Sequence, residues 1–204
     1  MEPALPPLAG IALAHADRPG LPTDVLGDLV AWLAAANVQG IVIGGVAASI
    51  LGRPRATQDV DALVLVSDAQ EFLEVGSKHG FRARIADPAG FAAESRMLLL
   101  RHESSGINVD ISMADLPFEE EAIRRGQKRP MRGVPVRIPL PTPEDLVIMK
   151  AVAHRPRDIA DIEGILDLHP GIDKARVRKW VANFAELLEM PELRTDLERL
   201  LKGR

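Results

Sequence analysis

Two aspartates separated by one residue, Asp59 and Asp61, form the clearest chemical signal in the sequence. In an extended strand, side chains at positions i and i+2 point to the same face, so this pair lies together while Val60 faces the opposite, buried side. Adjacent carboxylates repel, and one has a raised pKa unless a cation neutralises them. Mg²⁺, or Mn²⁺, is a hard cation that binds carboxylate oxygens and substrate phosphates. The alternative is a solvated strand edge at which Arg53 or Arg55 neutralises the pair.

A third carboxylate lies in a second alternating segment, residues 107–113, where Asn108, Asp110 and Ser112 share one face. Asp110 therefore offers its carboxylate to the same face of a sheet. Three carboxylates predict a site for two divalent ions.

Gly44 and Gly45 end an apolar strand, residues 40–44, and precede a short apolar segment, Val46 to Leu51, that is expected to be helical. A glycine pair there lets backbone N–H groups approach a phosphate, and the N-terminus of a helix favours the anion. A plain turn is the alternative. Combined with the carboxylates, the pair predicts a phosphate cradle facing a metal site. Two ions there would activate an attacking oxygen and stabilise a departing pyrophosphate.

The composition restricts the chemistry further. The 204 residues include 25 basic and 29 acidic side chains, a formal charge of −4, which argues against a protein held wholesale on nucleic acid by a basic surface. Cysteine is absent, which excludes disulfides, thiolate zinc sites and cysteine nucleophiles. Tyrosine is absent too, and aromatics make up only 3%, so a base-stacking platform is not expected. Carboxylates and metal remain as the available chemistry.

The elements that must position these residues predict an α/β (α+β) fold, a mixed β-sheet with flanking helices followed by a helical C-terminal segment. We expect a lead-in over residues 1–22, a mixed unit over 23–140 and helices over 141–204. Within the mixed unit, residues 87–90 are expected to be a loop, and residues 134–138 a final edge strand because Pro135 cannot donate to a ladder. No apolar run is long enough for a membrane span, and the start lacks the charge and apolar length of a signal peptide, so we expect a cytoplasmic protein.

The stretch from Gly44 to Asp61 resembles the nucleotidyltransferases of the DNA polymerase β-like superfamily, and within it the bacterial AbiEii/AbiGii toxin-type branch. That branch has a glycine pair, an Arg-x-Thr/Ser element (here Arg55-Ala-Thr57) and Asp-x-Asp at this spacing. A later stretch, residues 150–162, is similar to the branch's Lys…Arg-x-x-Asp-x-x-Asp helical motif. The resemblance spans about residues 40 to 165.

The resemblance implies a metal-dependent enzyme that moves a nucleoside monophosphate from an NTP to an acceptor hydroxyl and releases pyrophosphate. Residues 23–140 would be the catalytic domain, and residues 141–204 would close the nucleotide cleft. The implied metal ligands are Asp59, Asp61 and Asp110, and the last would help to deprotonate the hydroxyl. The implied setting is a toxin–antitoxin or abortive-infection system, with tRNA or another RNA as acceptor and an antitoxin protein as partner.

Further residues have two interpretations each. Lys150 either contacts nucleotide phosphate or base, oriented by Asp158 and assisted by Asp161, or only joins two helices through ion pairs. Arg53 and Arg55 either contact phosphate or neutralise the aspartates.

In the superfamily a residue with a hydroxyl group often follows the glycine pair, but here the residue is Val46. One phosphate-binding hydroxyl is therefore missing, and we expect weaker binding of the triphosphate. Ser49, one helical turn along, remains a nucleotide-binding candidate. Thr57 is placed to support Asp59 by a hydrogen bond, as metal-binding carboxylates require. Val46 favours one alternative function, a nucleotide- or antitoxin-binding module with weak catalysis. Another is a small-molecule nucleotidyltransferase of the antibiotic-modifying kind.

One basic stretch is either a solvated surface or a flank that guides RNA or nucleotide towards the aspartates. Its members are Arg124, Arg125, Lys128, Arg129, Arg132 and Arg137.

Overall fold

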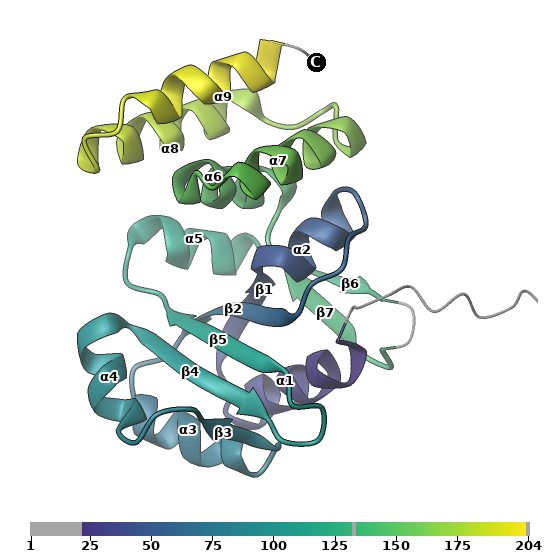
Figure 1. Ribbon diagram of the computed structural model, residues 1–204, viewed down its shortest axis with the longest axis vertical. Helices are drawn as coiled ribbons and strands as arrows, with labels where there is room; N and C mark the ends of the chain where they lie inside the picture. The colour runs from purple at the N-terminus through teal and green to yellow at the C-terminus, as the bar shows by residue number, and fades with distance from the viewer. Residues whose placement is uncertain (1–21, 132–133, 203–204) are drawn as a thin grey trace, which may run out of the picture.

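A computed structural model describes residues 22–131 and 134–202 (Figure 1). Nearly all of the expected lead-in, and Arg132 of the basic stretch, lie outside these residues. The strands are β1 (Gln39–Ile43), β2 (Asp59–Leu65), β3 (Phe81–Ala83), β4 (Met97–His102), β5 (Asn108–Met113), β6 (Gln127–Pro130) and β7 (Arg137–Leu140). The helices are α1 (Thr23–Ala35), α2 (Gly44–Leu51), α3 (Ala69–Ser77), α4 (Pro88–Ser95), α5 (Pro117–Arg125), α6 (Pro143–Ala153), α7 (Pro156–Leu168), α8 (Lys174–Leu187) and α9 (Glu192–Lys202).

The central sheet has the strand order β1-β2-β5-β4-β3. Only the β2–β5 pair is parallel, and the other neighbours are antiparallel. A parallel pair needs a crossover connection, which here contains α3, β3, α4 and β4. The aspartates predicted from two distant segments therefore lie on adjacent central strands.

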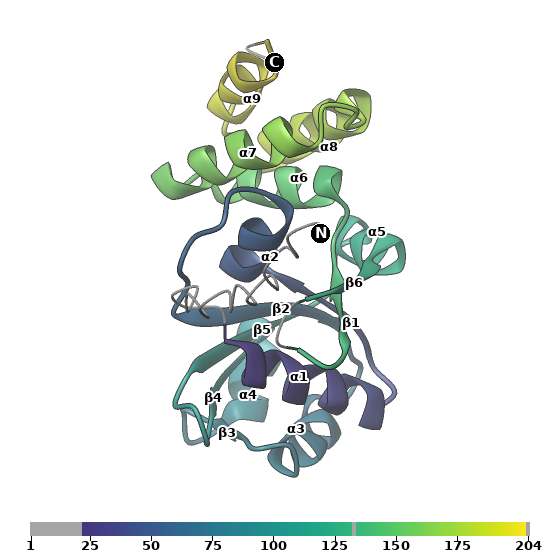
Figure 2. The same ribbon diagram turned by 90° about the vertical axis from the view of Figure 1, so that its right-hand side faces the viewer.

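Helices cover both faces of the sheet. In Figures 1 and 2, α1, α3 and α4 lie below it, whereas α2 and α5 lie above it and are covered in turn by the C-terminal helices α6 to α9. The core is mainly aliphatic, and Trp32 of α1 stacks on Phe72 of α3 with ring centroids 4.2 Å apart. The mixed sheet and the C-terminal helices confirm the fold class expected from the sequence.

The central strand β2 is held in place by its apolar residues. Val60, Ala62 and Val64 are fully buried, while Asp59 is exposed and Asp61 is partly buried. A shift of register by one residue would move the aspartates into the core and the valines into solvent. The hydrophobic pattern of this strand thus fixes the face on which the carboxylates lie.

Two expectations for local structure, a loop at residues 87–90 and a strand at residues 134–138, differ from the structure. Residues 87–90 are not a loop but the start of α4, because Asp87 caps the helix by accepting a hydrogen bond from the Gly90 N–H (2.9 Å) and Pro88 occupies the first helical position. The expected strand at residues 134–138 lies further along, at β7, and pairs with β6, a strand that the sequence did not predict.

Two of the C-terminal helices begin at residues typical of helix N-termini. Thr142 caps α6 by accepting a hydrogen bond from the Asp145 N–H, and Pro156 opens α7. Over residues 22–131 and 134–202, none of the helices combines the length and apolar character needed to cross a membrane.

Candidate active site

The three predicted carboxylates lie on adjoining positions of β2 and β5. Asp61 is paired in register with Asp110 across the parallel strands, and Asp59 is paired with Asn108. Because Asp59 and Asp61 are two residues apart on one strand, they share a face. Strand register, rather than loop conformation, therefore brings these groups together.

Asp61 lies in an environment that disfavours its charge. Burial raises the pKa of its carboxyl, and the negative charges of Asp59 and Asp110 raise it further. A hydrogen bond from the backbone N–H of Gly45 and the positive charge of Lys150 oppose this effect without cancelling it. The site thus holds negative charge that its own cations do not fully compensate.

The glycine pair lies between Asp61 and Thr57. Gly44 has a φ of +62°, a left-handed conformation, and a Cβ built there would lie 1.9 Å from Asp61 Oδ2. A Cβ on Gly45 would lie 2.7 Å from Thr57 Oγ1. Both positions therefore exclude any side chain, and the N-terminus of α2 is placed directly against Asp61.

Thr57 supports Asp59. Its hydroxyl lies 3.0 Å from Asp59 Oδ1 and 3.2 Å from the main-chain carbonyl oxygen of Asp59, so it can donate to either acceptor. This contact limits the rotation of the Asp59 side chain, which the sequence interpretation had required of a metal-binding carboxylate.

Asp110 has a partner that the sequence did not reveal, since it forms an ion pair with Arg84, just beyond β3. In the part of the chain that the structure describes, no three His, Asp or Glu side chains converge closely enough to form a ready metal site. The donor set nevertheless suits a hard divalent cation, because it consists of carboxylates, and burial together with their repulsion raises the pKa of Asp61.

A second cluster lies where α6 meets the start of α7. Lys150 Nζ is 2.8 Å from Asp158 Oδ1 and 2.8 Å from Asp161 Oδ2, and all three side chains are buried. Burial by itself raises the pKa values of both aspartates, but hydrogen bonds from Lys150 and from an arginine to each, Arg155 to Asp158 and Arg55 to Asp161, outweigh it and leave both pKa values below their usual range. Both carboxylates are therefore charged at neutral pH.

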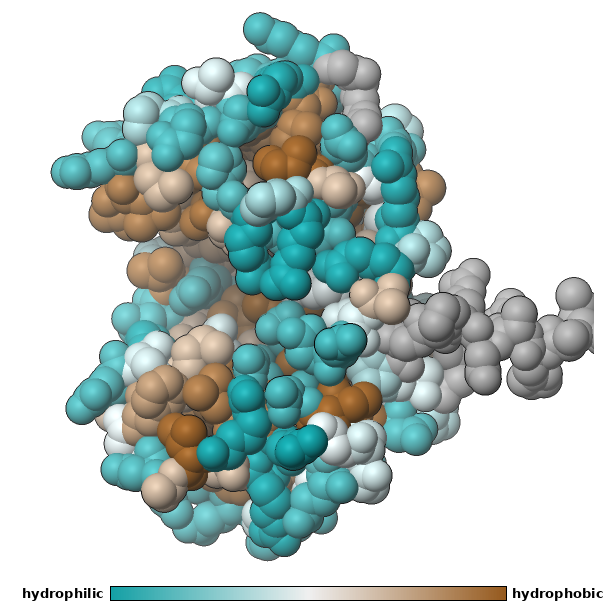
Figure 3. Space-filling model, viewed as in Figure 1, coloured by the Kyte–Doolittle hydropathy of each residue, from teal (hydrophilic) through white to brown (hydrophobic). Residues whose placement is uncertain are grey.

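Arg155 is a site residue that sequence reasoning missed. Its backbone N–H and its Nε both donate to Asp158 Oδ2, at 3.2 and 2.8 Å, while about half of its side chain is exposed. Its hydrogen bond to Asp158 raises its pKa, and the charges of Asp158, Asp61 and Asp59 raise it further, so Arg155 lies in the field of the β2 aspartates. Its position three residues before Asp158 in the Arg-x-x-Asp-x-x-Asp motif could have revealed it. Figure 3 shows hydrophilic side chains gathered over α7 and α2.

The sequence also matches the model of a family described as nucleotidyltransferase of unknown function (DUF6036), over residues 30–194. The chain belongs to this family. No curated protein matches this nucleotidyltransferase.

Solved structures share its fold. A crystal structure of an antigenic nucleotidyltransferase-like protein from Paracoccidioides brasiliensis has a TM-score of 0.51 and 16% identity, covering 86% of this chain and 91% of that one. ANT(2″)-Ia in complex with adenylyl-2″-tobramycin has a TM-score of 0.53 and 16% identity, covering 81% of this chain and 98% of that one. At such identities the likeness establishes the architecture of this nucleotidyltransferase and not its substrates.

The two predicted arginines of the nucleotidyltransferase both lie in the loop between α2 and β2, but they pair with different aspartates of α7. Arg55 donates to both carboxylate oxygens of Asp161, at 2.9 and 3.0 Å, and its pKa is raised by that hydrogen bond and by charges that include Asp59. Arg53 pairs instead with Asp167, near the end of α7, at 2.6 Å. Of the two, Arg55 joins the Lys150 cluster to the aspartates.

Ser49 and Val46 serve the scaffold of the nucleotidyltransferase. The Ser49 hydroxyl is buried and exchanges hydrogen bonds with the backbone N–H and C=O of Arg55, each at 3.0 Å. Val46 is fully buried. Ser49 thus fastens the loop that carries Arg55.

Proposed function

We propose that this nucleotidyltransferase moves a nucleoside monophosphate from an NTP to an acceptor hydroxyl and releases pyrophosphate, with divalent metal at Asp59, Asp61 and Asp110. The observation that carries the proposal is the register of β2 and β5, which sets Asp61 opposite Asp110 with Asp59 on the same face, directly against the glycine turn at Gly44. Hard cations and phosphate oxygens are the groups that such a surface suits.

The ions would be Mg²⁺ or Mn²⁺, two in number, held by Asp59, Asp61 and Asp110. When bound, they would neutralise charge on the transferred phosphoryl group and on the leaving pyrophosphate. Asp110 is now paired with Arg84, so it would take part only in place of that ion pair.

In the proposed reaction, the acceptor oxygen forms a bond to the α-phosphorus of the NTP while the bond from that phosphorus to the bridging oxygen of the β-phosphate breaks. The proton of the acceptor hydroxyl passes to Asp110, and pyrophosphate leaves with the electron pair of the broken bond. Thr57 keeps Asp59 oriented, and the close approach of Gly44 together with the hydrogen bond from the Gly45 N–H keeps the Asp61 carboxylate in place.

The Lys150 cluster would bind the triphosphate. Three cations, Lys150, Arg55 and Arg155, face two carboxylates, Asp158 and Asp161, so the cluster carries excess positive charge. The guanidinium of Arg155, about half exposed, can reach phosphate oxygens, while the buried Lys150 and Asp158 hold it in place. The helical segment 141–204 would thereby close the nucleotide cleft.

For the acceptor, we propose RNA, such as tRNA, in an AbiEii-like toxin–antitoxin setting with an antitoxin protein as partner. Support comes from the motif spacing and from the basic stretch around β6. A small-molecule acceptor is the second candidate, favoured by the shared fold with ANT(2″)-Ia, which was solved with an adenylylated antibiotic. A binding module with weak catalysis remains the third, because the buried Val46 offers the cradle only its backbone N–H.

The test is incubation with Mg²⁺ or Mn²⁺ and each labelled NTP, with total RNA in one arm and a set of aminoglycosides in another. Label on RNA that disappears in Asp59→Ala but persists in Asp24→Ala, an exposed aspartate on α1, supports the proposal. Label on an aminoglycoside favours the second candidate. Nucleotide binding without transfer to any acceptor would falsify the proposal in favour of the binding module.

A further inference from the structure

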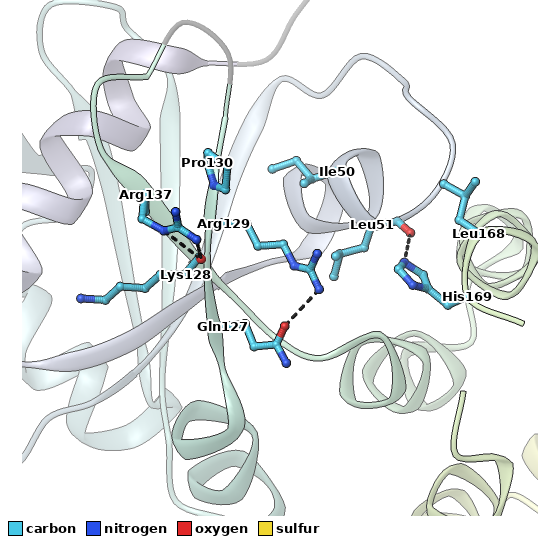
Figure 4. A pocket seen from close by; sticks show the side chains of 9 residues that line it. All are labelled: Ile50, Leu51, Gln127, Lys128, Arg129, Pro130, Arg137, Leu168 and His169. Carbon is cyan, nitrogen blue, oxygen red and sulfur yellow. Dashed lines mark hydrogen bonds between the residues drawn. The ribbon is translucent and has the colours of Figure 1, made fainter. Parts of the chain in front are cut away.

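A basic pocket lies at the C-terminal end of α2, the end away from Asp61. It has a volume of about 660 Å³ and is bounded by β6, by Arg137 of β7 and by the C-terminal ends of α2 and α7 (Figure 4). Three of the residues that line it, Lys128, Arg129 and Arg137, are cationic, His169 adds a titratable ring, and none is acidic. An anion is the ligand that such a lining favours.

Arg129 is the residue aimed most directly into this space. Its guanidinium extends from β6 towards α2, where it donates from Nη2 to Gln127 Oε1 at 3.0 Å (Figure 4). Its Nε is buried and has no hydrogen-bond partner in the described parts of the chain. A buried donor without an acceptor costs folding free energy, so an acceptor supplied by a ligand would remove that cost.

Two other polar groups of the pocket, Arg137 and His169, are held by the main chain, whereas the exposed Lys128 side chain extends away from Arg129 (Figure 4). Arg137 donates to the Lys128 carbonyl oxygen from Nε and Nη2, at 3.2 and 2.8 Å, which joins the two strands of the hairpin and leaves the guanidinium charge uncompensated there. His169 Nε2 lies 2.9 Å from the Leu51 carbonyl oxygen and must donate to it, because a carbonyl only accepts. Arg129, Arg137 and His169 are thus held in place by hydrogen bonds within the pocket.

The pocket and the candidate active site share two helices. α2 begins at Gly44, against Asp61, and ends at Leu51, in the pocket; its eight residues span about 12 Å. α7 begins beside the Lys150 cluster and ends at Leu168, also in the pocket. With a rise of about 3.4 Å for each nucleotide of a strand, three or four nucleotides cover that distance.

We propose that this pocket binds backbone phosphate of an RNA acceptor a few nucleotides from its reacting end, with Arg129 as the main contact. The inference rests on the proposed function and adds a binding site for the RNA acceptor proposed there. Guanidinium binds phosphate through paired N–H groups, and Arg129 has an N–H at Nε that no described residue uses. The same charges repel a polycationic aminoglycoside, so the pocket favours RNA over the antibiotic alternative.

The experiment measures binding of a fluorescent RNA oligonucleotide by anisotropy at several salt concentrations, without NTP, so that no transfer occurs. Arg129→Gln should weaken binding about tenfold at low salt, and should lower the slope of log affinity against log salt by about 0.7, the value for one lost contact to a single strand. Arg82→Gln, the same change at an exposed arginine on β3, should match the wild type. Arg129→Lys should keep part of the affinity, since it keeps the positive charge but loses the planar guanidinium that binds phosphate through two N–H groups.

Equal binding by the wild type and Arg129→Gln overturns the inference, as does a wild type that binds no RNA. Circular dichroism melts identify loss of fold, and Lys128→Gln with Arg137→Gln then provides a second reduction of pocket charge that should also weaken binding. The proposed function fails separately, when the wild type transfers no nucleotide to any acceptor. RNA binding that depends on Arg129 would support the pocket even then.

Discussion

The main chain of Gly44 lies in contact with the carboxylate of Asp61, so that a single added methyl group would lie 1.9 Å from Oδ2. Gly44 also has a positive φ, which disfavours any L side chain. The position of the Asp61 carboxylate therefore depends on the conformation of the strand-to-helix turn at Gly44, and a change in one requires a change in the other.

Gly44→Ala should abolish most transfer, by about a hundredfold or more, because displacing a reacting group by about 1 Å has effects of that size. Steady-state rates with saturating NTP measure this. Gly27→Ala in α1 is the matched control, because no atom lies within 4 Å of its added Cβ, and it should leave the rate unchanged. A Gly44→Ala variant with wild-type activity would contradict the close approach.

Asp61→Asn should lose about a hundredfold to a thousandfold in rate, yet unfold at a higher temperature than the wild type in EDTA. A carboxyl whose folded pKa is raised contributes stability below its ordinary pKa and loses it as pH rises through the folded value. Once ionised, Asp61 therefore costs stability, and the neutral amide removes that cost. Thermal unfolding measures the shift, and a lower melting temperature would contradict the uncompensated charge.

Arg155→Ala should raise the KM for NTP about tenfold with a smaller change in kcat, because a charged hydrogen bond to phosphate contributes mainly to binding. Arg157→Ala removes an exposed arginine two residues away and is the matched control. Initial rates over a range of NTP concentrations separate the two constants. A loss confined to kcat would show that Arg155 does not bind the triphosphate in the ground state.

Lys150→Met should destabilise the fold by about 3–5 kcal/mol, because it leaves Asp158 and Asp161 buried with part of their charge uncompensated. Urea unfolding at pH 7 gives this value. The triple variant that also carries Asp158→Asn and Asp161→Asn should recover part of the loss. If the single variant is as stable as the wild type, the three side chains do not form the buried ion pairs described.

The stability difference between the wild type and Lys150→Met should narrow in acid. Both aspartates have lowered pKa values, so their contribution is complete above the ordinary value of about 4 and is lost as pH falls through the folded values. Without Lys150 the charged aspartates contribute less to the free energy of unfolding. Acid therefore removes less stability from the variant than from the wild type. Urea midpoints from pH 7 down to pH 3 test this, and a constant difference would contradict it.

The sequence predicts the elements of the site well where alternation of polar and apolar residues marks a strand, or where a capping residue marks the start of a helix. Alternation places the Asp59–Leu65 strand and the polar face of the 108–113 strand, and Thr142 with Pro143 marks the start of α6. These signals are local, since each depends only on residues a few positions apart.

Tertiary contacts explain what the sequence did not reveal. Arg84 reaches Asp110 only because β3, β4 and β5 are neighbours in the sheet, and no spacing in the chain encodes that pair. The β6 strand, Gln127–Pro130, has neither alternation nor β-branched residues, and its pairing with β7 alone makes it a strand. In α4, Pro88 and Gly90 resemble turn residues until Asp87 is recognised as a cap.

The parallel pairing of β2 with β5, together with the docking of α7 on the loop that carries Arg55, has a consequence for biosynthesis. The groups of the candidate active site extend from Gly44 to Asp161, more than half of the 204-residue chain. A nascent polypeptide that has emerged only as far as Met113 contains every β-strand carboxylate but neither Lys150 nor Arg155. We therefore expect a chain that ends before Lys150 to transfer no nucleotide, because it lacks the cations proposed to bind the triphosphate.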